Sequence, residues 1–226
     1  MSTSTFILLL IGFIPSLVWL LFFLQEDSNH PEPKGLILST FIWGGVITFY
    51  VFPLQLVAKS LMDFLNMGEF SFVTLTTLAG IEEIMKFLIV YVWISKRKDF
   101  DEPIDAMIYM IIAALGFATV ENVATAIRAS NSFELLTLRF IGANLLHSLA
   151  SGFVGYCWAK AILKKSSLKR YLAVGLVLAT LVHGMFNYFM IIWGPGIRIA
   201  SFLIFIAFLV LNDFELLKTR KVRPAL

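Results

Sequence analysis

Four charged side chains lie inside long apolar stretches of the sequence, where a charge is costly. Glu82, Glu83 and Lys86 share one stretch, and Glu121 lies in the next. A charge at the centre of a membrane helix costs about 2.5–3.5 kcal/mol on insertion scales, so four would cost on the order of 10 kcal/mol without compensation. These residues must therefore face a bundle interior or a hydrated cavity, where ionisable groups usually have a function.

The spacing of the first three charges favours contact between them. Lys86 follows Glu82 by four positions and Glu83 by three, so on a helix its ammonium group can reach either carboxylate. Two close carboxylates resist joint ionisation, which leaves one of them available as a base or acid near neutral pH. The alternative is an ion pair that only joins helices, and it would leave the second glutamate unexplained.

Imidazole and amide side chains extend this set into two further apolar stretches. His147 lies in one of them, and His183 and Asn187 lie four residues apart in the other, on one helix face. A lone histidine in a membrane helix often only donates a hydrogen bond to a neighbouring helix. Two histidines and three glutamates on four successive stretches instead favour a shared site that activates water.

Whether a metal takes part is open from the residues alone. Glutamate and histidine are zinc ligands, and three protein ligands plus a water form the usual catalytic zinc site. The H-E-x-x-H marker of zinc proteases is absent from the sequence, so zinc-dependent and metal-free, glutamate-activated hydrolysis both remain open. Asn187 could donate a hydrogen bond to a developing oxyanion or could simply orient His183. The single cysteine, Cys157, excludes an intrachain disulfide and a cysteine-based zinc site.

Seven long apolar runs must position these side chains, and they predict an all-α, polytopic membrane bundle. Of the 226 residues, 59% are hydrophobic and only 15% are charged, which excludes a soluble domain, a disordered chain and an ordinary nucleic-acid-binding protein. We expect one transmembrane domain over residues 1–226, with the site motifs within 70–190. The predicted spans are residues 5–24, 35–58, 70–94, 104–129, 135–163, 170–193 and 197–217.

Basic residues in the loops predict the orientation of this bundle. Clusters at 96–98, 164–170 and 218–223 all fall on one side of a seven-helix bundle, and the positive-inside rule makes that side cytoplasmic. The N-terminus is then outside and the C-terminus cytoplasmic. By the helical rise per residue, the side chains of one glutamate of the pair and of the three other site residues lie about 18–26 Å from the cytoplasmic ends of their spans, which predicts a water-filled site opening outward. These residues are Glu82, Glu121, His147 and His183. We expect contact with the lipid bilayer and none with nucleic acid.

Four short motifs, in this order, resemble the PrsW family of bacterial intramembrane proteases. They are EEIMK at 82–86, FATVEN at 117–122, NLLHS at 144–148 and HGMFN at 183–187. The PEP turn at 31–33 and DAMIY at 105–109 are also similar to that family. The likeness covers about residues 25–190, and the family is related to a larger group that includes the CAAX prenyl endopeptidases and bacteriocin-immunity proteins.

This resemblance implies an intramembrane endopeptidase, usually described as a metalloprotease. It implies cleavage of a single-pass membrane protein, such as an anti-sigma factor, near its extracytoplasmic side. The water-activating carboxylate would come from Glu82 or Glu83, and a zinc ion, if one is bound, would be held by Glu121, His147 and His183. The implied catalytic residues are Glu82, Glu83, Glu121, His147, His183 and Asn187, with Lys86 and Asn122 in supporting positions.

Two other classes of function would use the same buried residues. A proton-coupled transporter could relay protons through Glu82, Glu83, Lys86 and Glu121, although the sequence has no obvious inverted repeat and no pair of broken helices. A non-catalytic membrane partner would need these polar side chains only for helix packing.

Overall fold

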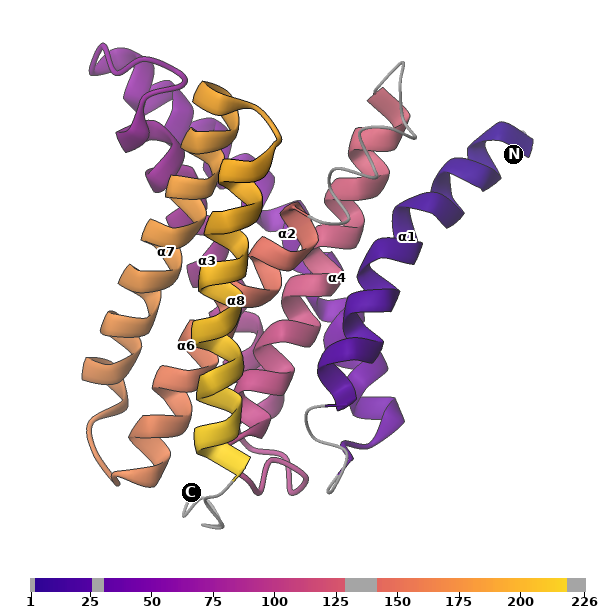
Figure 1. Cartoon of the computed structure of the whole chain (residues 1–226), viewed down its shortest axis with the longest axis vertical. Coiled ribbons are helices and arrows are strands. Elements are labelled where there is room, and N and C mark those ends of the chain that lie inside the picture. Colours follow the sequence, from indigo (N-terminus) through magenta and orange to yellow (C-terminus); the bar gives the residue numbers. More distant parts are fainter. Residues whose placement is uncertain (1–2, 26–30, 129–141, 219–226) are drawn as a thin grey trace.

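The computed structural model describes residues 3–25, 31–128 and 142–218, and within these ranges it is an all-α bundle (Figure 1). The prediction of an all-α fold is therefore confirmed for this part of the chain. Its helices are α1 (Thr3–Leu24), α2 (Lys34–Phe64), α3 (Phe72–Ile94), α4 (Asp105–Arg128), α6 (Ala143–Leu163), α7 (Leu168–Trp193) and α8 (Ile197–Lys218).

The predicted spans and the described helices differ most at the end of α2. The α2 helix continues to Phe64, beyond the predicted end at 58, and its extra turns carry Lys59 and Asp63. The helix therefore continues beyond the apolar run into a segment that carries charged side chains. The α6 helix is described from Ala143, whereas the predicted span starts at 135. Residues 129–141 lie outside the described residues.

Among the described residues, four helices are long and apolar enough to cross a membrane. They are α2, α4 over Asp105–Ile127, α7 and α8. The part Gly12–Leu24 of α1 is a shorter apolar helix. The α3 and α6 helices carry most of the buried charged and imidazole side chains. The lengths and compositions of the four long helices agree with a polytopic membrane bundle.

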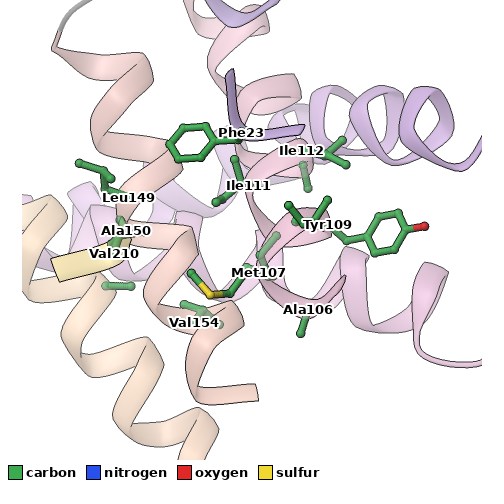
Figure 2. Packing of buried hydrophobic residues seen from close by; sticks show 14 of the residues in the cluster. Phe23, Ala106, Met107, Tyr109, Ile111, Ile112, Leu149, Ala150, Val154 and Val210 are labelled. Carbon is green, nitrogen blue, oxygen red and sulfur yellow. The ribbon is translucent and has the colours of Figure 1, made fainter. Parts of the chain in front are cut away.

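The α4 helix forms the core of the bundle. It packs against α1, α2 and α6, and every residue from 103 to 119 is buried. Figure 2 shows Met107 and Ile111 of α4 among side chains of the neighbouring helices, including Phe23 of α1 and Leu149 and Val154 of α6. A helix that is apolar on most sides belongs inside a bundle, and the charged residues of α4 accordingly lie near its ends, with Asp105 at the start and Glu121 and Arg128 in the C-terminal part.

Glycines allow backbone contact where the site-bearing helices cross. A Cβ atom on Gly44 of α2 would lie 2.7 Å from the Cα atom of Ala113 in α4. A Cβ atom on Gly184 of α7 would lie 2.9 Å from the Cα atom of Thr76 in α3. Small residues at such crossings bring membrane helices close together. The second crossing places His183, next to Gly184, directly against α3.

A second buried acidic group lies away from this crossing, at the start of α2 and α4. Tyr109 donates a hydrogen bond to the Glu32 carboxylate, which also contacts Asp105. The Oδ2 atom of Asp105 accepts the backbone N–H groups of Asp101 at 2.9 Å and Glu102 at 2.8 Å. Glu32 precedes the first turn of α2, and burial raises the pKa of its carboxyl above the ordinary value of 4.5.

Replacement of Glu32 by Gln tests this contact through the pH dependence of stability. A raised pKa in the folded state contributes stability below the unfolded-state pKa, and this contribution is lost as the pH rises through the folded-state pKa. Gln keeps an acceptor for Tyr109 but does not titrate. In detergent, the unfolding temperature of Glu32→Gln relative to the native protein should therefore rise as the pH is raised above 4.5. The exposed control Glu215→Gln should show no such trend, and parallel pH profiles for Glu32→Gln and the native protein would contradict the expectation.

Candidate active site

The ammonium group of Lys86 joins three helices inside the bundle. Its Nζ atom donates at 2.7 Å to Glu83 Oε1 on α3 and at 2.9 Å to His147 Nδ1 on α6, and it lies 4.6 Å from the ring centroid of Phe117 on α4. Because an ammonium group can only donate, His147 accepts through Nδ1. Its Nε2–H then donates to Glu121 Oε2 at 2.9 Å, so a continuous polar chain connects α3, α6 and α4.

Glu83 is fully buried and has a partner on every side. Its Oε1 atom, besides accepting from Lys86, lies 2.9 Å from Nδ1 of His183 on α7. Its Oε2 atom accepts a hydrogen bond of 2.9 Å from the hydroxyl of Ser151 on α6. A buried carboxylate compensated in this way holds α3, α6 and α7 together.

Glu82, the neighbouring residue, has a different environment. Its Oε1 atom accepts a hydrogen bond of 2.8 Å from Gln55 Nε2 on α2. Its Oε2 atom is buried and has no hydrogen-bond partner among the described residues. That oxygen lies 3.7 Å from His183 Nε2 and 3.9 Å from Lys86 Nζ. Glu82 therefore keeps one carboxylate oxygen free at the centre of the site.

His183 is oriented toward this free oxygen by Glu83. Its Nδ1–H donates to Glu83, which leaves the lone pair of Nε2 on the side of Glu82. The ring of His147 packs edge-on against that of His183, with 4.8 Å between their centroids. A carboxylate that fixes an imidazole tautomer in this way is the usual outer partner of a metal-ligating histidine.

The donor atoms of this centre fit a metal ion. Glu82, His147 and His183 each offer one ligand atom, and these atoms lie within 4.8 Å of one another. Two imidazole nitrogens and a carboxylate oxygen are a common ligand set of catalytic zinc, and the unpaired Glu82 Oε2 is an orphan atom that an ion would satisfy. His147 is bonded through both ring nitrogens, so it would join only by giving up its bond to Lys86 or to Glu121.

The remaining predicted residues lie around the centre or away from it. Glu121 is partly exposed, with 29% of its side-chain surface accessible, and reaches the centre through His147. Asn187 is half-buried on α7, one turn beyond His183. Asn122 donates at 3.1 Å to Asn144 Oδ1 on α6 and at 3.4 Å to the carbonyl of Gly12 on α1. The described contacts of Asn122 therefore connect α4 to α6 and α1.

Two residues of the centre are absent from the predicted set. Gln55 binds Glu82 from α2, and Ser151 binds Glu83 from α6. The sequence carries a weak signal for each, because Gln55 is an amide within an apolar run and Ser151 follows His147 by one helical turn. Nothing in the spacing indicates which glutamate either of them contacts.

The fold and this centre together define a class of protein. The centre is a buried set of carboxylate, imidazole and ammonium groups, and it lies between helices of membrane-spanning length. Such a set provides acid–base groups and metal ligands away from bulk water, which is the arrangement that a membrane-embedded hydrolase requires.

Comparison with known proteins identifies the family. The family model described as PrsW family intramembrane metalloprotease matches residues 32–212, and the chain belongs to this family. It is therefore a multi-pass membrane protein and a hydrolase with a protein substrate. The resemblance predicted from the four motifs is confirmed, which favours a protease over a transporter or a non-catalytic partner.

Relatives with known names agree with this assignment. The chain is 27% identical to Protease PrsW of Geobacillus kaustophilus (strain HTA426) over 192 residues, which cover 84% of this chain and 83% of the relative. It is 27% identical to Protease PrsW of Bacillus subtilis (strain 168), with 78% of this chain and 79% of the relative covered. For Protease PrsW of Clostridioides difficile (strain 630) the identity is 26%, with 82% and 79% covered. No solved structure matches the chain significantly.

Replacement of Gln55 by Leu tests whether this amide positions Glu82. Loss of the hydrogen bond, worth about 0.5–1.5 kcal/mol, should lower kcat for peptide cleavage by roughly 2–13-fold with little change in KM. Ser60→Leu, at an exposed position of the same helix, is the control and should leave both constants unchanged. Equal kcat values for Gln55→Leu and the native protein would remove Gln55 from the site.

Proposed function

We propose that this chain is an endopeptidase that hydrolyses a peptide bond of a single-pass membrane protein, with Glu82 as the base that activates water. The observation that carries this proposal is the unpaired Oε2 atom of Glu82. This atom is buried, and it faces His183 Nε2 at 3.7 Å. The other carboxylate oxygens of the two adjacent glutamates all have described hydrogen-bond partners, so this oxygen is the acceptor available for the proton of a water molecule.

The surrounding residues hold the reacting groups in place. Glu83 and Lys86 fix the rings of His183 and His147 through the hydrogen bonds described above. Asn187 lies one turn from His183, where its amide could donate to the oxyanion that forms on the substrate carbonyl. Burial away from bulk solvent strengthens each of these electrostatic contacts relative to water.

We also propose that the site binds zinc. A bound zinc ion lowers the pKa of water and polarises the substrate carbonyl. His147 and His183 would hold it, with Glu121 as the third ligand if Glu82 is the base. The distances favour a second assignment, in which Glu82 is the third ligand and Glu121, hydrogen-bonded to His147, is the remaining carboxylate that can accept a proton.

The orientation of the bundle supports cleavage near the extracytoplasmic side. The connections from α3 to α4 and from α6 to α7, which carry basic residues, lie at the same end of the bundle as the end of α8 (Figure 1). By the positive-inside rule we assign this end to the cytoplasm and the start of α1 to the outside. By resemblance to the family, an anti-sigma factor is the proposed kind of substrate.

Two neighbouring substitutions separate chemistry from stability. With the protein reconstituted in vesicles together with a candidate anti-sigma factor, Glu82→Gln should lower cleavage by about 10²–10⁴-fold and leave the unfolding temperature unchanged. Glu83→Gln should lower the unfolding temperature, because it leaves the buried Lys86 ammonium without its carboxylate partner, a loss of about 3–5 kcal/mol. Normal cleavage by Glu82→Gln would exclude this residue as the base.

Removal of metal tests the zinc proposal by two measurements. A chelator should abolish cleavage, and added zinc should restore it. The zinc content of purified variants then separates the two assignments. If Glu82 is only the base, Glu82→Gln should retain zinc and Glu121→Gln should lose it. If Glu82 is a zinc ligand, Glu82→Gln should lose zinc and Glu121→Gln should retain it. A native protein that contains no metal and cleaves normally in chelator would establish metal-free hydrolysis by the glutamates.

A further inference from the structure

A cleft between α2 and α4 leads to the centre from the side of the bundle. It has a volume of about 220 Å³ and is lined by residues of these two helices alone. We propose that this cleft is the subsite for an apolar side chain of the substrate next to the bond that is cut. The assignment rests on the proposed function and adds where the substrate lies.

The inner end of the cleft is formed by two residues that touch the centre directly. Gln55 lines the cleft and donates to Glu82 Oε1 at 2.8 Å. Glu121 lines it from the opposite wall, with its Oε2 atom 2.9 Å from His147 Nε2. A substrate side chain in the cleft would therefore belong to a residue next to the peptide bond that faces the free oxygen of Glu82.

The positions of the glycines explain why the cleft exists. The α2 and α4 helices are in backbone contact at Gly44 and Gly116, where a Cβ atom would lie 2.7 Å from Ala113 Cα and 2.8 Å from the carbonyl carbon of Phe41, respectively. The cleft begins one turn further along, at Thr48 on α2. Beyond this point the helices separate, and Figure 1 shows their later ends on opposite sides of the bundle. The cleft thus lies on the side of the glycines that we assign to the outer half of the membrane.

The chemistry of the walls matches an unwound peptide with an apolar side chain. Val51, Val120 and Ala124 line part of the walls with apolar side chains, beside the polar residues of the cleft. Thr48 contributes a hydroxyl that is buried without a hydrogen-bond partner among the described residues. A peptide must unwind before it can be cut, and its freed backbone groups then need new partners inside the membrane. The volume is below the roughly 300–1,000 Å³ of cavities that enclose drug-sized ligands, so it suits one side chain with its backbone.

Replacement of Ala124 by Phe fills the cleft and tests the assignment. The probes are four single-pass membrane peptides that differ only in the two residues flanking the cut bond, which are both Gly, both Ala, both Leu or both Phe. The native protein should cut the Leu and Phe peptides fastest. In Ala124→Phe, kcat/KM for these two should fall at least about tenfold relative to the Gly peptide. Equal relative rates in both proteins would overturn the assignment.

Controls separate this result from loss of folding or loss of activity. Val57→Phe adds the same ring to a 70% exposed position of α2 and should leave the relative rates unchanged. If Ala124→Phe does not fold, cross-linking replaces it. The buried Cys157 is changed to Ala, and Glu82→Gln prevents cleavage. With an added thiol oxidant, Ala124→Cys should then form a disulfide with a peptide cysteine next to the bond, and Val57→Cys should not.

The outcomes of these experiments test the subsite and the proposed function separately. If the folded native protein cuts none of the four peptides, the proposed function fails and the subsite fails with it. If the native protein cuts them but neither the selectivity nor the cross-link depends on Ala124, only the subsite is overturned. A change in selectivity in Ala124→Phe, or a specific cross-link at Ala124→Cys where Ala124→Phe does not fold, supports both.

Discussion

Burial of the Lys86 ammonium group inside the bundle is the constraint on which the site depends. An unpaired charge in this environment costs several kcal/mol, and no single neighbouring helix supplies all of the compensation. Glu83 provides the opposite charge from the same helix, His147 provides an acceptor from α6, and Phe117 provides a ring face from α4. Glu83 in turn draws in a side chain from α7. Satisfying one ammonium group therefore fixes the relative positions of α3, α4, α6 and α7 at one level of the bundle.

Close backbone packing makes these short contacts achievable. Imidazole and carboxylate side chains span only a few ångströms, so their helices must nearly touch. Gly184 supplies this condition between α7 and α3, and Gly155 supplies it between α6 and α4, where a Cβ atom would lie 2.5 Å from Met107 Cα. In a lipid environment such packing also replaces the hydrophobic driving force that soluble helices would have. The same small residues thus stabilise the bundle and bring the centre together.

The cost of burying charge made the helices and the core of the site predictable from the sequence. Apolar runs predicted the helices, and the glutamates and histidines within them were expected to meet because isolated charges in lipid are too costly. The detailed contacts depend on which helices are neighbours, and residue spacing does not contain that information. For this reason the contact of Gln55 with Glu82 was not predicted. The placement of Asn122 against Asn144 and Gly12, away from the centre, was equally out of reach.

The paired glutamates show how stability and chemistry can be divided between adjacent positions. Neighbouring side chains on a helix point about 100° apart, so Glu83 faces α6 and α7, while Glu82 binds Gln55 of α2, which in turn lines the cleft. Lys86 lies 2.7 Å from the first and 3.9 Å from the second, and this difference leaves one oxygen of Glu82 unpaired. A single glutamate could not serve both purposes, because the hydrogen bonds that make a buried carboxylate stable also occupy the lone pairs that it would need to accept a proton.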